Sequence, residues 1–138
     1  MTKKIITGIL LLLILSAVLY LALQGPQETT SLSNAFYQKA KELGYTGTHL
    51  QFRSDIHLPE YFIVALAAML FCRAMGQKPY IGAAGACLFG LLEETIKIFL
   101  PTREFGPRDL LMDLTGAALA LFLFLTVTAI RRNKHPKG

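Results

Sequence analysis

Hydrophobic residues in this chain are concentrated in four long runs, which are separated by short polar segments. The runs cover approximately residues 5–23, 59–75, 81–100 and 110–130. An α-helix rises about 1.5 Å per residue, so about 20 apolar residues cross the ~30 Å hydrocarbon core of a bilayer. We therefore predict an all-α integral membrane protein, in which four transmembrane helices form a bundle and residues 1–138 form a single domain.

The first run, "IITGILLLLILSAVLYLAL", follows two lysines and has two interpretations. It is either a cleavable signal peptide or an uncleaved membrane anchor. The run is long for the apolar part of a signal peptide, and no A-x-A cleavage pattern follows it. We therefore predict an uncleaved first span.

A shorter segment, residues 32–43, has apolar residues at helical spacing along one face and polar residues mostly elsewhere. We predict a short amphipathic helix that lies along the membrane surface or packs on the bundle. Ser31 or Ser33 can cap its start, and Gly44 can end it. The following residues, "GYTGTHLQFRSDIH", are predicted to form an irregular connector.

Composition and charge agree with a membrane protein. Of the 138 residues, 53% are hydrophobic and only 17% are charged. The net charge of +5 is not gathered into a basic patch with interleaved aromatics, so we predict no binding of nucleic acid. Many basic residues instead flank the runs near both termini and in the connector around residue 75, which favours a cytoplasmic location for these parts and for both termini. They are Lys3, Lys4, Arg73, Lys78, Arg131, Arg132, Lys134 and Lys137.

The segment "EETIKIFLPTREFGPRDLLMD", residues 93–113, brings many charges between the third and fourth apolar runs. In the predicted topology it is an outward hairpin. An ionisable side chain that faces lipid is costly, so the charged residues within the helices are expected to face inward and pair. They continue stripes of small residues, which we expect to face each other across the hairpin. The stripes are Gly82, Ala86, Gly90, Glu93 and Lys97, and Asp109, Asp113, Gly116 and Ala120.

Three side chains at this outer end are candidates for chemistry. Glu94 or Asp109 could act as a general acid or base, with His57 as its partner. Loop residues such as Arg103 and Arg108 are expected to be solvated. One histidine and carboxylates on separate helices can bind a cation, but no HExxH or paired-histidine spacing is present. We therefore predict no metal and no cofactor, and no motif indicates a catalytic nucleophile.

The same residues resemble a known family. The stretch "EETIKIFLPTREFGPRDLLMDLTGAALA" is similar to the C-terminal signature of VanZ-like membrane proteins, with Glu94, Arg103, Asp109 and Gly116 at its positions. "HLPEYFIVALAAML" resembles the start of the family's second span, an H-x-x-x-Y pattern. The resemblance covers about residues 57–120. It implies a bacterial cytoplasmic-membrane protein of the cell envelope, linked to antibiotic resistance, because the named member is associated with resistance to teicoplanin.

Two residues depart from this family pattern. Lys97 stands where the family usually has glutamine, and Asp113 where it usually has asparagine. Lys97 can reach Glu93 or Glu94 on its own helix, or Asp113 across the hairpin. Our hypothesis is that Lys97 and Asp113 form an interhelical salt bridge in place of an amide contact.

Together these features predict an outward-facing polar cleft that binds membrane lipids, a lipid-linked envelope precursor or a glycopeptide-related component. Two alternatives stay open: an enzyme that performs acid/base chemistry on a lipid-linked substrate, and a transporter or flippase subunit. Because four spans are few for a complete transport path, the last alternative requires a homo-oligomer. The predicted ligand-binding residues are Arg103, Glu94, Asp109, Asp113, Lys97, His57, Glu60 and Tyr61.

Overall fold

The computed structural model describes residues 2–23, 26–100 and 105–134, which form helices and no strand. The helices are α1 (Thr2–Leu23), α2 (Pro26–Glu42), α3 (His49–Asp55), α4 (His57–Ala74), α5 (Pro79–Ile98) and α6 (Pro107–Lys134). The all-α prediction is therefore confirmed for this part of the chain. The four predicted spans all correspond to helices, and each helix begins two or three residues earlier than predicted.

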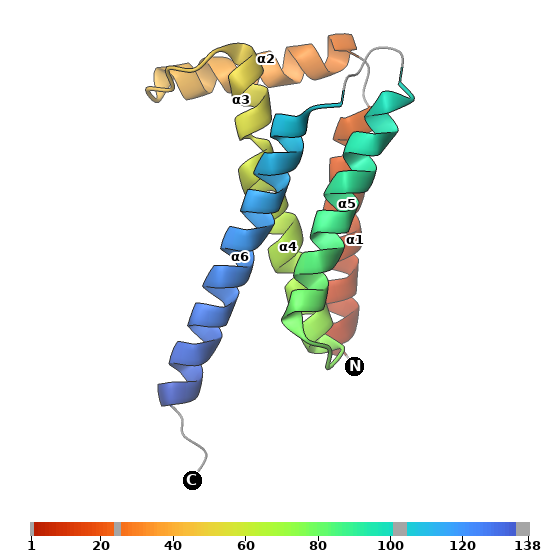
Figure 1. Cartoon of the computed structure of the whole chain (residues 1–138), viewed down its shortest axis with the longest axis vertical. Coiled ribbons are helices and arrows are strands. Elements are labelled where there is room, and N and C mark those ends of the chain that lie inside the picture. The colour runs from red at the N-terminus through yellow and green to blue at the C-terminus, as the bar shows by residue number, and fades with distance from the viewer. Residues whose placement is uncertain (1, 24–25, 101–104, 135–138) are drawn as a thin grey trace.

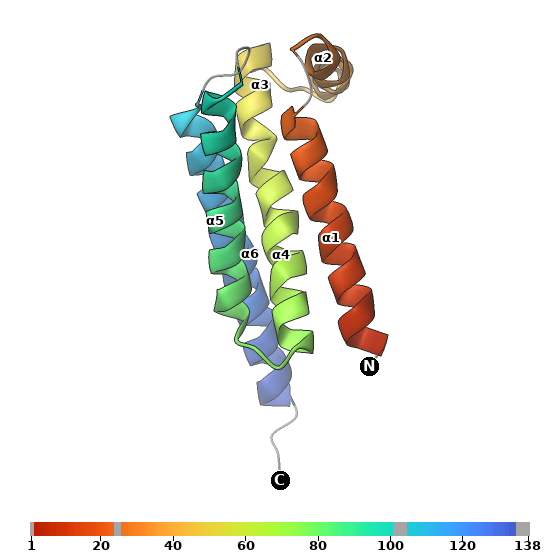
Figure 2. The same ribbon diagram turned by 90° about the vertical axis from the view of Figure 1, so that its right-hand side faces the viewer.

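Helices α1, α4, α5 and α6 run side by side, and α2 lies across one end of them (Figures 1 and 2). Helix α4 is central, because it packs against α1, α5 and α6. Helix α3 leads into α4 at the end where α2 lies, which we call the α3 end. The start of α1, the turn between α4 and α5 and the end of α6 lie at the opposite end (Figure 1).

Three segments of the described chain are long and apolar enough to cross a membrane: Thr2–Leu23, His49–Ala74 and Pro107–Asn133. The second combines α3 and α4, which are separated only by Ile56. Large apolar side chains such as Leu12, Leu13 and Phe122 lie exposed on the outside of the bundle. Exposed apolar surface of this extent is typical of contact with lipid, and together with the three candidate spans it supports an integral membrane protein.

Small residues let the helices approach closely. A methyl group added at Gly82 of α5 would lie 2.6 Å from the backbone of Ala68 in α4, and one added at Gly116 of α6 would lie 2.2 Å from the carbonyl oxygen of Leu58. Both stripes of small and polar residues are buried, except that Asp109 is half-buried. The two stripes meet in part, as expected, because a methyl group added at Gly90 would lie 3.1 Å from Asp113 Oδ2, but α4 also lies against Gly82 and Gly116.

The region between α1 and α4 differs most from its prediction. Helix α2 begins at Pro26, so Ser31 and Ser33 lie within it and do not cap its start. Gly44 does follow its end, with a φ of 98° that favours glycine. The connector predicted to be irregular contains α3. Its start is a capping box, because Thr48 Oγ1 accepts from the Gln51 N–H at 3.2 Å and Gln51 Oε1 accepts from the Thr48 N–H at 2.8 Å.

Candidate functional site

Ionisable side chains gather inside the α3 end of the bundle. Glu94 and Asp113 are completely buried, and Glu93 and Lys97 are each at most 5% exposed. They come from the last turns of α5 and the second turn of α6, where these helices pack against the start of α4. We call these residues and their direct partners the polar cluster, which consists of two neighbouring hydrogen-bonded groups: Tyr61, Glu93, Glu94 and Lys97, and Ser54, His57, Asp109 and Asp113.

One half of the polar cluster is organised by Lys97. Its Nζ lies 3.3 Å from Glu93 Oε1 and donates a hydrogen bond to Glu94 Oε1. These contacts arise because residues three and four positions apart lie on the same helix face. Tyr61 Oη donates to Glu93 Oε2 at 2.7 Å, and the Gly106 N–H donates to Glu94 Oε2 at 3.0 Å. Both oxygens of Glu94 are therefore already engaged.

The other half is organised by His57, whose ring is 12% exposed. Its Nδ1 lies 2.9 Å from Asp113 Oδ1, and its Nε2 lies 3.7 Å from Asp109 Oδ2. An ionised carboxylate can only accept, so the proton of the shorter contact belongs to Nδ1. Asp109 also accepts a hydrogen bond from the Ser54 hydroxyl of α3. The imidazole thus joins α4 to α6, and the Asp109 carboxylate joins α6 to α3.

The hypothesis of a Lys97–Asp113 salt bridge is wrong. Lys97 pairs with Glu93 and Glu94 of its own helix, and Asp113 pairs with His57. The physical reason is the position of α4, which supplies an imidazole to Asp113 while two carboxylates lie one turn from Lys97.

Charge in the polar cluster is unbalanced in the described residues. Four carboxylates, those of Glu93, Glu94, Asp109 and Asp113, share one lysine ammonium and one histidine. Buried ions require partners, because taking them out of water is costly. The cluster therefore has the chemistry to hold protons or a cation.

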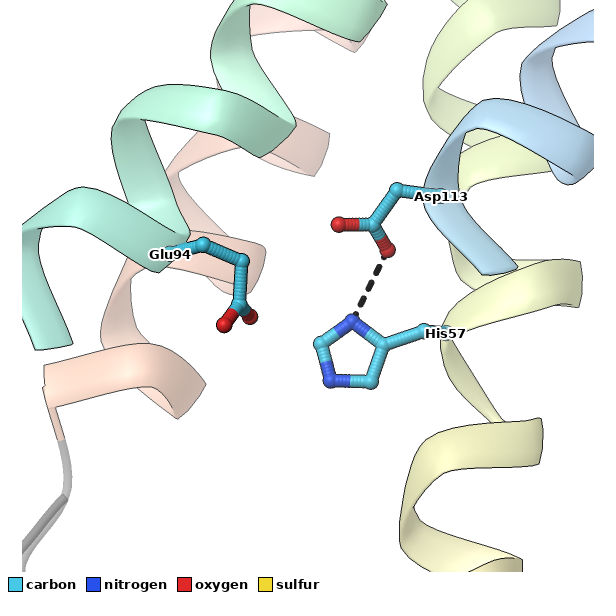
Figure 3. Close-up of side chains that lie close together, drawn as sticks. All are labelled: His57, Glu94 and Asp113. Atoms are coloured by element: carbon cyan, nitrogen blue, oxygen red, sulfur yellow. Dashed lines mark hydrogen bonds and ion pairs between the residues drawn. The ribbon is translucent and has the colours of Figure 1, made fainter. Parts of the chain in front are cut away.

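Asp113 has one oxygen that is not engaged. Its Oδ2 is buried and has no hydrogen-bond partner in the described part of the chain. Figure 3 shows the side chains of His57, Glu94 and Asp113 pointing toward one another from three helices. Each of the three offers one possible metal-ligating atom, and these atoms lie within 4.8 Å of one another.

Two polar pockets open beside the cluster. The larger has a volume of about 450 Å³ and lies between α3, the start of α6 and the end of α5. The smaller, of about 130 Å³, lies on the side of α1. Arg53, His57 and Lys97 line both pockets. The larger is also lined by Leu50, Gln51, Ser54, Phe105, Gly106, Pro107, Arg108 and Asp109.

The structure brings together most of the predicted site residues. His57, Tyr61, Glu94, Lys97, Asp109 and Asp113 belong to the polar cluster, and Glu60 is half-buried and lines the smaller pocket. Arg103, another predicted ligand-binding residue, lies outside the described residues. Arg108 is exposed, as predicted, and donates to Asp55 Oδ1 at 2.8 Å.

Two site residues, Arg53 and Ser54, were not predicted, because they belong to α3. The T-x-x-Q spacing of Thr48 and Gln51 was the signal that could have identified this helix. The hydroxyl of Tyr45, which precedes the candidate span His49–Ala74, donates to Asp55 Oδ2 at 2.7 Å. Desolvation and this hydrogen bond raise the pKa of Tyr45 above its usual value. Asp55 therefore joins the loop before α3 to Arg108 at the start of α6.

No family model, curated protein or solved structure matches this chain. The similarity to VanZ-like proteins therefore stays a prediction, and inference about function rests on the geometry and chemistry of the α3 end.

Proposed function

We propose that this protein binds the anionic headgroup of a membrane lipid or of a lipid-linked envelope component at the α3 end of its bundle. The observation that carries this proposal is the larger pocket, in which Arg53 and Arg108 lie beside Leu50 and Phe105. Arginine guanidinium groups suit phosphate and carboxylate, because they offer several donors in a planar arrangement. Apolar side chains at the same opening suit the lipid part of such a ligand.

The pocket also indicates what else the headgroup carries. Asp109 and His57 line its inner wall, and Asp109 would repel a phosphate that approached it closely. The anionic group therefore binds nearer to Arg53 and Arg108. A hydroxyl or amine of the same headgroup, such as those of a sugar, would donate to Asp109. We infer a phosphate-bearing amphiphile with additional hydrogen-bond donors.

Two separate pockets along α1 offer space for the lipid part of the ligand. Val18 lines the smaller polar pocket, and Leu15, one turn away, lines an apolar pocket of about 260 Å³ between α1, α4 and α5. Phe71 and Phe89 also line this apolar pocket. Successive turns of α1 thus border first a polar and then an apolar space. This order matches that of an amphiphile with its head at the α3 end.

The proposed topology places four helices across the membrane: the three candidate spans and, in addition, α5. It places the α3 end at the outer face. Basic residues at the opposite end, including Lys3, Arg73, Lys78 and Arg131, support a cytoplasmic location for that end. Helix α2 lies across the α3 end and carries the exposed Phe36, which suits a position at the membrane surface (Figure 1). In this topology the pocket faces ligands of the outer leaflet.

One observation favours a second function, an enzyme acting on a lipid-linked substrate. Asp113 holds Nδ1 of His57, and the ring lines the pocket. A buried carboxylate that fixes the tautomer and orientation of a histidine is a common feature of general bases. His57 is therefore a better candidate base than Glu94, both of whose oxygens are engaged.

No comparable feature supports a transporter or flippase. The core between α4, α5 and α6 toward the opposite end is apolar, with Ala65, Met69, Ala86 and Ala120 among its buried residues. Among the described residues, this buried core offers a polar substrate no charged or strongly hydrogen-bonding side chain. The polar cluster is therefore a site at one end of the bundle and not part of a polar path through it.

Thermal unfolding of the purified chain in detergent tests the leading proposal. A polyprenyl phosphate and phosphatidylglycerol, added in turn, should raise the Tm of the wild-type chain, because a ligand that binds only the folded state stabilises it. Arg53→Gln should remove most of the shift, whereas Arg131→Gln, at the opposite end, should retain it. Equal shifts in the wild-type and Arg53→Gln chains would overturn the assignment to this pocket.

The enzymatic alternative has a separate test. Turnover of a lipid-linked phosphate ester by the wild-type chain should disappear in His57→Gln, while the Tm shift caused by the lipid remains. Absence of any turnover by the wild-type chain, with the Tm shift intact, would leave binding as the function and exclude catalysis on that substrate.

A further inference from the structure

We propose that His57, Glu94 and Asp113 form a binding site for a first-row divalent cation such as Zn²⁺. The residues come from α4, α5 and α6, and their possible ligand atoms lie within 4.8 Å of one another (Figure 3). One imidazole nitrogen and two carboxylate oxygens are a donor set found in zinc sites. Mg²⁺ and Ca²⁺ prefer donor sets made only of oxygen.

An independent observation points to a ligand at this place. Asp113 is completely buried, and its Oδ2 has no hydrogen-bond partner in the described part of the chain. Leaving a buried carboxylate oxygen unpaired is unfavourable, and such atoms usually have a bound water, ion or protein partner. In Figure 3 the carboxylate of Asp113 faces the space shared with Glu94 and His57. A cation there would supply the partner that Oδ2 lacks.

The surrounding charges also favour a cation. Lys97 contacts Glu93 and Glu94 and does not pair with Asp113 or Asp109 within the described residues. The side of the cluster formed by α4 and α6 therefore has two carboxylates and only the imidazole of His57 to balance them. A dication placed between His57, Glu94 and Asp113 would offset this excess of negative charge directly.

The groups behind the three ligands would hold them in place. Asp113 Oδ1 is now bonded to His57 Nδ1–H, so a cation at Nδ1 requires the other neutral tautomer, with the proton on Nε2. Nε2–H would then face Asp109 Oδ2, now 3.7 Å away, as in the carboxylate–histidine–metal arrangement of many zinc sites. Lys97 and the Gly106 N–H would orient Glu94 in the same way.

Binding requires the three ligand atoms to move closer together. In a tetrahedral zinc site, ligand atoms bonded at about 2.0–2.2 Å to the ion lie roughly 3.3–3.6 Å from each other. From a separation at the 4.8 Å limit, a pair of ligand atoms must therefore approach by up to about 1.5 Å. Three protein ligands leave a coordination position open, as in catalytic zinc sites. Since His57 also lines the larger pocket, a ligand bound there could reach this position.

Zinc uptake by the purified full-length chain in detergent tests the site. The chain is treated with a chelator, equilibrated with ZnCl₂ and analysed for bound metal, and its affinity is measured by competition with a fluorescent chelator. We expect one Zn²⁺ per chain. Loss of even an outer partner of a metal ligand costs about 10- to 100-fold in affinity, so His57→Gln, Glu94→Gln and Asp113→Asn should each lose at least as much.

Two matched controls and one spectrum complete the test. Asp55→Asn and His49→Gln change the same residue types outside the ligand set and should keep the wild-type affinity. Co²⁺ added to the wild-type chain should give visible d–d absorption bands that excess Zn²⁺ removes. Two results would overturn the proposed site. One is that the wild-type chain takes up no more metal than a detergent blank, and the other is that uptake is unchanged in all three ligand variants.

Discussion

The two ends of the α4–α5–α6 bundle are held together by different means, although the same helix faces continue from one to the other. Toward the opposite end, Gly82, Ala86 and Ala120 are buried and bring the helix backbones close together. At the α3 end the same faces carry Lys97 and Asp113, which are joined to neighbours by ion pairs. Close packing also occurs at the α3 end, where Gly116 lies against Leu58, so the charges there are an addition to small-residue packing and require a separate explanation.

The difference between the two ends of the bundle also indicates which end is the better candidate for a functional site. Replacing a buried ion pair by apolar residues of similar volume is often neutral or stabilising, so buried charges are weak evidence for a role in stability. Intramembrane ionisable groups, by contrast, frequently mark binding and proton-transfer sites. Small residues therefore account for packing of the bundle, and the polar cluster is the candidate for the binding site that we propose.

The largest effect is expected from breaking the cluster at Lys97. Lys97→Gln leaves Glu93 and Glu94 buried without their ammonium partner, and removing one member of a buried pair costs about 3–5 kcal/mol. The free energy of unfolding in detergent, from chemical denaturation, measures this loss.

Double variants identify the partner of Lys97. Lys97→Gln with Glu94→Gln should recover part of the lost stability, because a carboxylate is neutralised together with the ammonium. Lys97→Gln with Asp113→Asn should give additive losses, since those residues do not pair. Recovery by the second combination and not by the first would restore the interhelical salt bridge that the structure contradicts.

A smaller loss is expected from crowding the small-residue end. Gly82→Ala places a methyl group 2.6 Å from the α4 backbone, and backbone displacement of this kind typically costs about 1–3 kcal/mol. Gly85→Ala, three residues away on α5, meets nothing within 4 Å and should be neutral or slightly stabilising, because alanine favours helix. If the two variants have the same Tm, the helices do not pack as described.

Removing the cap at the start of α3 should lower the stability of this helix modestly. Thr48→Ala removes the capping box that begins the helix bearing Arg53 and Ser54, at a cost of about 1 kcal/mol. Amide hydrogen exchange should accelerate over residues 49–55 and not over α6. Unchanged exchange in α3 would show that the cap does not hold this wall of the pocket.

The smallest effect is expected at the surface ion pair of Arg108 and Asp55. Both side chains are more than a third exposed, and exposed pairs contribute at most about 1 kcal/mol. Arg108→Gln should therefore change the free energy of unfolding by less than this amount while weakening the binding of an anionic lipid. A large loss of stability would place Arg108 among the structural charges and not among the ligand-binding ones.

Helix periodicity predicted the bundle and the inward direction of Glu93, Lys97 and Asp113, because lipid excludes the alternative for ionisable groups. Their partners were harder to predict. Lys97 had acceptors at one turn and across the hairpin, and the choice depended on where α4 supplies His57. The position of α4 relative to α5 and α6 cannot be predicted from the residues that neighbour Lys97 in the sequence.

Helix α3 was missed although a local signal existed. The spacing of Thr48 and Gln51 indicated its start, but the polar, glycine-containing connector around it outweighed this signal. The sequence did predict that His57, Glu94 and Asp113 lie at the same end of the bundle. It could not predict their mutual distances, because the residues come from three helices and share no linear spacing. The expectation of no metal rested on short motifs and stays a prediction.

Photo-crosslinking tests the central proposal, that the α3 end binds an anionic lipid headgroup, most directly. The wild-type chain in lipid is irradiated with a phospholipid that carries a diazirine on its headgroup, and the labelled residues are identified by peptide mass spectrometry. We predict that labels concentrate in residues 50–54 and 105–109, which line the larger pocket. The proposal would be contradicted by labels that spread evenly over α1 and α6, or by labels that gather at Arg131, Arg132 and Lys134.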